Sequence, residues 1–190
     1  MGRASKAEAV RTRVRIVETA SEMFRSHGVE NVSVADIMGA LGLTTGGFYK
    51  HFSSKEALAA EAVKLAFDQS SSVWSGLIST GEHQPQDRMK LIDHYLQLAP
   101  ERKCPMMAFA NQSSGLQADS TLREVYNDGS KALLDTFVGA EGAGDAASPS
   151  KAKLLFAAMV GARVLKEASG DASWVNDLRD AVLKTAATTA

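Results

Sequence analysis

The sequence lacks the features that mark secreted, membrane-spanning or disulfide-stapled proteins. Its 190 residues include one cysteine, four prolines and 6% aromatic residues. A single cysteine rules out an internal disulfide and fits a reducing cytoplasm. The longest apolar run, from Leu154 to Ala162, is far shorter than the ~20 residues that span a bilayer. Since the N-terminus also has no apolar segment of the kind found in secretion signals, we expect a cytoplasmic protein with no membrane partner.

Sequence signals of enzymes and metal sites are absent too. The four histidines are scattered, and no group of His, Cys, Asp and Glu has the spacing of metal ligands. The sequence contains no G-x-S-x-G motif, no P-loop and no dinucleotide-binding fingerprint. The pair Gly46-Gly47 has no strand pattern before it, so it does not read as a phosphate-binding loop. These absences argue against an enzyme, and no cofactor is expected.

Charge is balanced over the chain but uneven along it, with a net charge of −1. Residues 1–56 hold eight Lys or Arg against six Asp or Glu, and five of those cations lie within the first fifteen residues. A positive excess at one end favours phosphate contact there, although a solvated helix end is the plainer alternative. Three of these cations, Arg11, Arg13 and Arg15, lie off the apolar face of the first predicted helix and are expected to be free to meet phosphates.

The segment from Ser33 to Lys55 is predicted to form two short helices joined by a tight turn. Ser33 is a natural N-cap, and Asp36 three residues later can complete a capping box. Gly42 supplies the left-handed geometry of a helix end, and Thr44 or Thr45 then begins a second helix. Two short helices so closely joined form a helix-turn-helix, whose second helix can enter a DNA major groove.

The run GLTTGGFYKHFSSKEAL, from Gly42 to Leu58, resembles the DNA-binding signature of the TetR (tetracycline-repressor) family of bacterial regulators. The resemblance is detailed from about Val10 to Leu65 and extends beyond that only to chain length and an all-helical pattern. It implies a ligand-responsive transcriptional regulator, namely a repressor that binds double-stranded operator DNA and is released by a small apolar or electrophilic effector.

The same resemblance implies a set of DNA contacts. The positions of Tyr49 and His51 meet phosphates, Lys50 faces the bases or the adjoining backbone, and Lys55 anchors a phosphate where the fourth helix begins. Threonine hydroxyls lie at the start of the recognition helix, and two glycines let its backbone approach DNA closely. Phe48 and Phe52 are better explained as core. The predicted DNA-binding residues are Ser33, Thr44, Thr45, Gly46, Gly47, Tyr49, Lys50, His51 and Lys55.

Helical periodicity and cap residues predict an all-α protein of about nine helices. The predicted spans are 5–28, 33–41, 44–51, 53–79, 85–100, 104–115, 119–138, 151–168 and 172–187, with a Gly-, Ala- and Ser-rich loop at 139–149. Residues expected to face inward from the first helix are Val10, Val14, Val17, Ala20 and Phe24. Residues 1–52 would form a helix-turn-helix DNA-binding domain, and a long fourth helix would join it to a helical effector-binding and dimerisation domain at 53–190.

The last two predicted helices, Lys151–Ala168 and Ala172–Ala187, are the expected homodimer interface. One helix-turn-helix reads only a few base pairs, and a two-fold dimer places two of them about one DNA turn, ~34 Å, apart. The apolar surface that motivates this interface comprises Leu154, Ala157, Ala158, Gly161, Ala162, Leu165, Val175, Leu178 and Val182.

Seven methionines and several aromatic residues favour an apolar effector pocket that can re-pack, between the fourth and eighth predicted helices. The helix at 53–79 would link this pocket to DNA. Most of the candidates are individually better explained as core residues. The candidate lining residues are Phe67, Trp74, Met89, Tyr95, Cys104, Met107, Phe109, Tyr126, Phe137 and Met159, with Asn111, Gln112 or Arg163 as polar anchors.

Cys104 has two interpretations. It is either a small apolar residue of a helix bundle, or a sensor thiol activated by a helix N-terminus and by neighbouring Arg102 and Lys103. Two other functions stay open as alternatives: a helical-bundle small-molecule-binding protein without DNA binding, and a Cys104-dependent enzyme. The basic recognition segment argues against the first alternative, and the lack of a partner base argues against the second.

Overall fold

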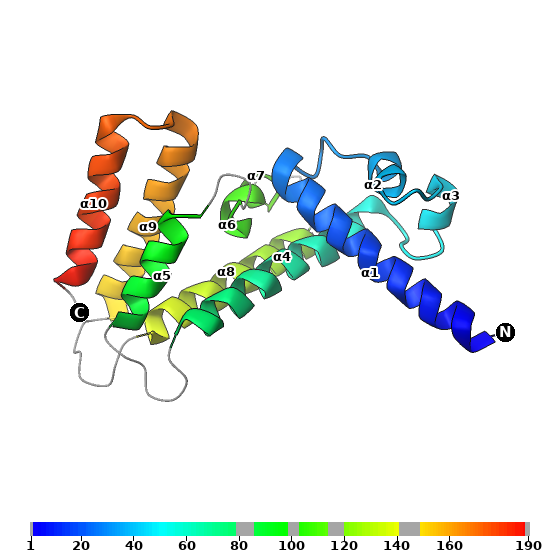
Figure 1. Ribbon diagram of the computed structural model, residues 1–190, viewed down its shortest axis with the longest axis horizontal. Coiled ribbons are helices and arrows are strands. Elements are labelled where there is room, and N and C mark those ends of the chain that lie inside the picture. The colour runs from blue at the N-terminus through cyan, green and yellow to red at the C-terminus, as the bar shows by residue number, and fades with distance from the viewer. Residues whose placement is uncertain (1, 79–85, 99–102, 114–119, 141–148, 189–190) are drawn as a thin grey trace. The chain divides into compact units, whose positions relative to one another are not determined.

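The computed structural model describes residues 2–78, 86–98, 103–113, 120–140 and 149–188 (Figure 1). Of the described residues, 83% are helical and none is in a strand, so the all-α prediction is confirmed. No helix in the described ranges is long and apolar enough to cross a membrane. The helices are α1 (Gly2–His27), α2 (Val34–Ala40), α3 (Thr45–Phe48), α4 (Lys55–Leu77), α5 (Gln86–Leu96), α6 (Pro105–Ala108), α7 (Ala110–Ser113), α8 (Ser120–Gly139), α9 (Pro149–Ser169) and α10 (Ser173–Ala187).

Ten helices therefore stand in the described ranges where about nine were predicted. The predicted helix at 104–115 is divided, because Phe109 leaves the helical region with φ −113° and ψ 2° between α6 and α7. Helix α4 begins at Lys55, and its first turn is capped by Ser54, whose hydroxyl accepts the Ala57 N–H at 3.2 Å. Residues 141–148 of the predicted loop, and the helix ends predicted at residues 79, 85, 100, 115 and 119, lie outside the described residues.

The chain divides into two compact units. Unit 1 comprises Met1–Gln69 and Lys103–Ser130, and unit 2 comprises Ser70–Arg102 and Lys131–Ala190. Helices α4 and α8 each contribute residues to both units. The predicted boundary between residues 52 and 53 divides a DNA-binding domain from an effector-binding and dimerisation domain. It does not coincide with the boundary between the compact units, and it stays a prediction.

In unit 1, α1 packs on α2 and α2 packs on α3, as Figure 1 shows. Ile16, Ala20 and Phe24 of α1 are fully buried. The predicted inward position of Val10 and Val14 is wrong, since they are 58% and 49% exposed. The reason is that α1 begins at Gly2, so its first turns run past the helices that cover its later turns. The side chains of residues 6–11 are all exposed.

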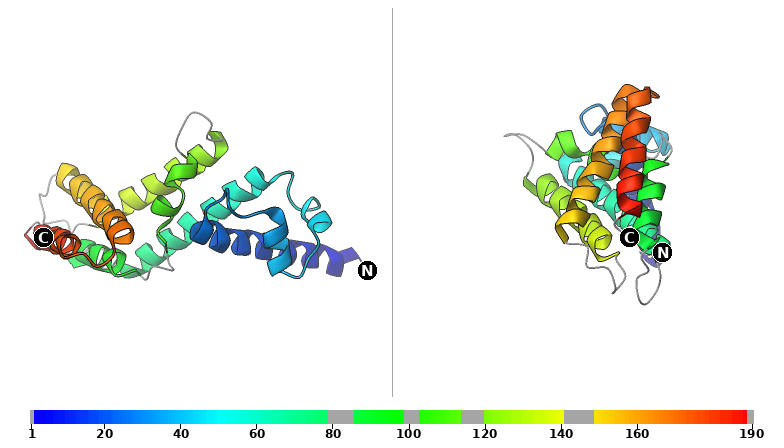
Figure 2. Two further views of the ribbon diagram at one scale, coloured as in Figure 1. Left: turned by 90° about the horizontal axis from the view of Figure 1, so that it is seen from above. Right: turned by 90° about the vertical axis from the view of Figure 1, so that its left-hand side faces the viewer.

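In unit 2, α5, α9 and α10 pack together, and α9 and α10 lie side by side (Figure 2). Four aromatic rings fill part of its core: the Trp74 centroid lies 6.2 Å from Tyr95, 6.4 Å from Phe137 and 6.4 Å from Phe156. Arg88 is 6% exposed and donates to the carbonyl groups of Phe137 at 3.3 Å and Val138 at 3.1 Å. It thereby satisfies carbonyl groups that the last turn of α8 leaves without intrahelical partners.

Candidate nucleic-acid interface

The start of α2 is held by the predicted capping box. Ser33 Oγ accepts the Asp36 N–H at 3.1 Å, and Asp36 Oδ2 accepts the Ser33 N–H at 2.8 Å. The Ser33 side chain and then its backbone lower the pKa of Asp36, and the positive charge of Lys55 adds to this effect. Lys55 therefore lies near the start of α2, so the structure brings two predicted phosphate contacts, Ser33 and Lys55, to one side of unit 1.

A tight turn leads from α2 into α3. Gly42 takes φ +69°, and the Leu43 N–H donates to the Met38 carbonyl group at 2.8 Å. Thr44 occupies the N-cap of α3 but makes no side-chain cap bond, which leaves its exposed hydroxyl available. Helix α3 has four residues and ends at Phe48 instead of His51. Glycine has poor helix propensity, and two of the four residues are glycine.

Two buried phenylalanines anchor the recognition segment, as predicted. Phe48 is 0% exposed, Phe52 is 4% exposed, and their rings stack with centroids 5.5 Å apart. Tyr49 packs edge-on against Phe48 with its own side chain 69% exposed. Lys50 is exposed, and His51 is half-buried. The core pair therefore presents a phenol and an ammonium group outward from one short turn.

Neither glycine of α3 is demanded by the protein's own structure. Both have ordinary negative φ values, because the glycines with positive φ in the described ranges are Gly28, Gly42 and Gly170. A Cβ added at Gly46 would meet no atom within 4 Å, and one at Gly47 would lie an ordinary 3.6 Å from Met38 Cε.

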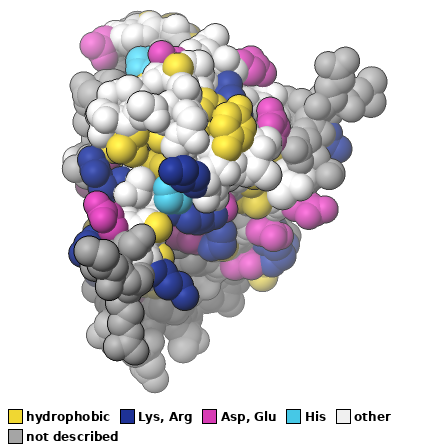
Figure 3. Space-filling view, turned by 90° about the vertical axis from the view of Figure 1, so that its right-hand side faces the viewer, with side chains coloured by type: hydrophobic (Ala, Val, Ile, Leu, Met, Phe, Trp, Pro, Cys, Tyr) yellow, Lys and Arg dark blue, Asp and Glu magenta, His cyan; other side chains and the backbone are white. Residues whose placement is uncertain are grey.

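Arg13 is not free to meet DNA, so that expectation is wrong. Its guanidinium donates through Nη1 to Glu61 Oε2 at 2.7 Å and through Nη2 to Glu61 Oε1 at 2.5 Å, and it lies 4.6 Å from the centre of the Phe52 ring. The hydrogen bonds to Glu61 raise the pKa of Arg13 against the opposing effect of burial. Arg11 and Arg15 are exposed, as expected. Figure 3 shows Lys and Arg side chains gathered around a histidine on one face, with acidic side chains among them.

Seven of the predicted effector-pocket residues lie in unit 1: Phe67, Cys104, Met107, Phe109, Asn111, Gln112 and Tyr126. The rings of Phe67 and Tyr126 meet edge-on at 5.8 Å, and the Tyr126 hydroxyl donates to the Met106 carbonyl group at 2.8 Å. Burial is the main cause that raises the pKa of Tyr126. A Cβ at Gly129 would lie 2.2 Å from Phe67 Cγ, so the absence of a side chain there lets α8 pack closely on Phe67.

The other six lie in unit 2: Trp74, Met89, Tyr95, Phe137, Met159 and Arg163. Trp74, Tyr95 and Phe137 belong to the aromatic core, and Met159 is 0% exposed. Arg163 is 4% exposed, donates to the Leu98 carbonyl group and lies 3.9 Å from Glu167 Oε2. Sequence reasoning missed Phe156, whose ring lies 5.5 Å from Phe137, because a lone aromatic on an apolar helix gives no sign of its partners.

Cys104 is 4% exposed and precedes a helix of only four residues, which favours the packing interpretation over a reactive thiol. In the described part of the chain, no group of three or more His, Cys, Asp or Glu could hold a metal ion.

A capped α2, a glycine turn and a short α3 with outward basic and hydroxyl groups form a helix-turn-helix, a motif that can place its second helix in a DNA major groove. Comparison with known proteins identifies a family that this segment matches. The sequence model of the bacterial regulatory proteins of the tetR family matches residues 16–62. This part of the chain therefore resembles the TetR family of transcriptional regulators.

Relatives match over about 30% of this chain. A protein of Escherichia coli named "Probable acrEF/envCD operon repressor" is 41% identical over 58 residues, which are 30% of this chain and 26% of that protein. The HTH-type transcriptional regulator TtgR of Pseudomonas putida is 41% identical over 58 residues, 30% of this chain and 28% of that protein. The match thus spans little more than a quarter of each relative's length.

Solved structures extend the likeness of fold to the whole chain. A TetR-family regulator from Cytophaga hutchinsonii superposes with a TM-score of 0.81 at 19% identity, covering 96% of both chains. A TetR transcriptional regulator from Chloroflexus aurantiacus superposes with a TM-score of 0.74 at 25% identity, covering 94% of this chain and 95% of that one.

Proposed function

We propose that the protein is a homodimeric repressor that binds operator DNA through α2, α3 and the start of α4, and leaves it when a small effector binds. The observation that carries this proposal is the recognition segment, in which buried Phe48 and Phe52 hold exposed Tyr49 and Lys50 outward. An exposed phenol and ammonium group on a rigid base suit phosphate contact. The proposal assigns no enzymatic activity and places the protein in the cytoplasm.

The proposed contacts come from three elements. Ser33 at the start of α2 and Lys55 at the start of α4 position the domain on the phosphate backbone. Thr44 and Thr45 at the start of α3 and Lys50 after its end approach the groove, and Gly46 and Gly47 let the backbone of α3 come close. Tyr49 and His51 supply further phosphate contacts.

The proposed dimer forms through α9 and α10. Apolar side chains stay exposed on these two helices, Leu154 at 71% and Leu165 at 40% on α9, and Leu178 at 37% on α10. Ala157 and Ala158 are exposed beside them. Three residues assigned to this surface from the sequence are instead buried within the protomer: Ala162, Val175 and Val182. Two exposed residues that the sequence did not single out, Val164 and Trp174, join the surface.

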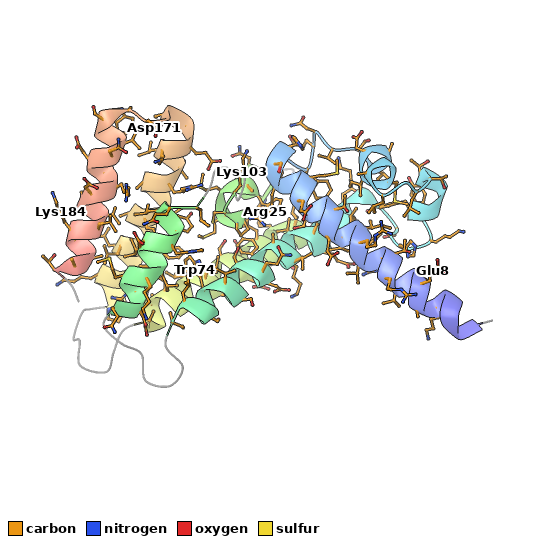
Figure 4. All side chains as sticks on the ribbon, viewed as in Figure 1. Glu8, Arg25, Trp74, Lys103, Asp171 and Lys184 are labelled. Atoms are coloured by element: carbon orange, nitrogen blue, oxygen red, sulfur yellow. The ribbon has the colours of Figure 1, made fainter. Side chains whose placement is uncertain are left out.

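Contacts inside unit 1 offer a path from the proposed effector region to the DNA-binding helices. Arg25 near the end of α1 donates through Nε at 3.0 Å and Nη2 at 2.6 Å to the Lys103 carbonyl group, just before α6 (Figure 4). Tyr126 of α8 holds the Met106 carbonyl group inside α6. An effector that displaces α6 would therefore pull on α1. The coupling free energy needed for a useful repressor is ~1–3 kcal/mol, and DNA must weaken effector binding equally.

A gel-shift with the DNA upstream of the protein's own gene tests the proposal. A repressor shifts this fragment at concentrations that leave unrelated DNA free, whereas a small-molecule-binding protein without DNA binding shifts neither. Titrating apolar and electrophilic compounds into the complex, with Cys104→Ser alongside, then tests the effector. Release in both proteins indicates a reversible pocket, release only with intact Cys104 indicates a sensor thiol, and no release by a compound that binds the protein contradicts the switch.

A further inference from the structure

One arginine of the DNA-binding unit joins three separate parts of the chain. Arg13 on α1 makes a two-pronged contact with Glu61 on α4, with its two terminal guanidinium nitrogens on separate carboxylate oxygens at 2.7 and 2.5 Å. Its guanidinium carbon lies 4.6 Å from the centre of the Phe52 ring. Phe52 in turn stacks on Phe48, the last residue of α3, and Phe48 carries the edge contact of Tyr49.

This geometry is different from that of a phosphate-binding arginine. Both prongs of the fork are taken by Glu61, so the pair carries no net charge towards DNA. A guanidinium over an aromatic face adds a directional attraction that a lysine ammonium group would not reproduce in the same geometry. The contact therefore fixes where the Phe52 ring lies relative to α1 and α4. The side chains of Arg13 and Glu61 are each 42% exposed. Because solvent screens the attraction between exposed charges, the ion pair alone adds little to the stability of the fold.

We propose that Arg13 is a positioning residue for DNA recognition: without touching DNA, it sets the placement of the recognition segment through Phe52 and Phe48. This inference rests on the proposed function, since it concerns the same DNA-binding surface. Loss of the fork leaves α3 folded but lets its phenol and ammonium groups move away from the positions that match the groove.

Two charge-preserving changes isolate this role. Arg13→Lys keeps the charge but loses the planar fork, and the double change Arg13→Gln with Glu61→Gln removes both partners and leaves the summed charge of the pair at zero. Lys64→Arg, which also keeps the charge of an exposed ion pair, with Asp68 at 2.7 Å on α4, is the matched control. Lys50→Ala serves as the reference for a direct phosphate contact, for which the slope of log affinity against log salt falls by about one unit.

Affinity is measured by fluorescence anisotropy for the upstream fragment and for a scrambled fragment, over a salt series and well below the melting temperature of each variant. Both Arg13 variants are expected to lose roughly 2- to 100-fold in affinity for the upstream fragment, as for disrupted contact networks. Their salt slope and their affinity for the scrambled fragment should match those of the wild type, and Lys64→Arg should change neither the affinity nor the salt slope.

Three results overturn the inference. The first is a folded Arg13→Lys that binds the upstream fragment within twofold of the wild type. The second is a double variant whose salt slope falls as that of Lys50→Ala does, since Arg13 would then contact phosphate itself. The third is unfolding of both variants at the assay temperature, which would make the pair a stability element. If the wild type shows no preference for the upstream fragment, the proposed function fails instead.

Discussion

At Gly46 the effect of a side chain on the stability of the protein can be measured separately from its effect on DNA binding. A glycine inside a helix destabilises it relative to alanine, yet nothing in the described structure requires one at this position. The backbone does not have a positive φ, and a Cβ there would meet no atom within 4 Å. The remaining reason for glycine is close approach by a partner, so Gly46→Ala should act in opposite directions on stability and on DNA binding.

The gain in stability comes from helix propensity, and the loss of DNA affinity comes from steric overlap with the DNA. Replacing a helical glycine by alanine raises the free energy of unfolding by up to about 1 kcal/mol, and we expect about 0.5 kcal/mol for so short a helix. For a protein of this size that raises Tm by about 1–2 °C. A methyl group forced into a packed interface costs about 1–3 kcal/mol, which lowers operator affinity by roughly five- to hundredfold.

The assay pairs a thermal melt with an anisotropy titration on the upstream fragment. Gly76→Ala is the matched control: this position also has no atom within 4 Å of an added Cβ, and it lies in the last turn of α4, which belongs to unit 2. We expect the control to bind DNA like the wild type. Wild-type affinity in Gly46→Ala would show that DNA does not approach this face, and a lowered Tm would show that the surroundings of Gly46 are not open.

Three further predictions concern the rest of the chain. Leu154→Glu, on a side chain 71% exposed on α9, should convert a dimer into monomers by light scattering at micromolar concentration, and a monomeric wild type would contradict the proposed interface. Gly129→Ala should lower the free energy of unfolding by about 1–3 kcal/mol, because its Cβ would lie 2.2 Å from Phe67 Cγ; an unchanged urea midpoint would refute this. Because the pKa of Tyr126 is raised above 10.0, the stability from its neutral phenol is present below that pH and is lost as pH rises through the raised pKa. Base titration of unfolding should show this loss in the wild type and not in Tyr126→Phe.

The features predicted correctly from the sequence are those with local causes. The Ser33 capping box, the glycine turn at Gly42 and the packing of Phe48 on Phe52 each involve residues within four or five positions of one another. Their geometry follows from short-range backbone and side-chain preferences. The short length of α3 could also have been predicted from the sequence, since two glycines in a row disfavour a longer helix.

The features that sequence reasoning missed depend on distant partners. Arg13 pairs with a residue 48 positions away, and nothing in the sequence distinguished it from Arg11 and Arg15. Val10 and Val14 fit the apolar pattern of α1. The pattern cannot show that the first turns of the helix extend beyond the helices that cover its later turns. Effector-pocket residues are least predictable, because methionines and aromatics that line a pocket have the same composition as those that fill a core.

The account is tested most directly by titrating the upstream DNA fragment with the wild type, Lys50→Ala and Tyr49→Phe at several salt concentrations. We expect the wild type to prefer the upstream fragment over unrelated DNA, with affinity that falls steeply with salt. Both variants should stay folded and bind more weakly, and Lys50→Ala should lower the salt slope by about one unit. Equal affinity of the wild type for unrelated DNA, or unchanged binding by a folded Lys50→Ala, would contradict the assignment of this surface to DNA.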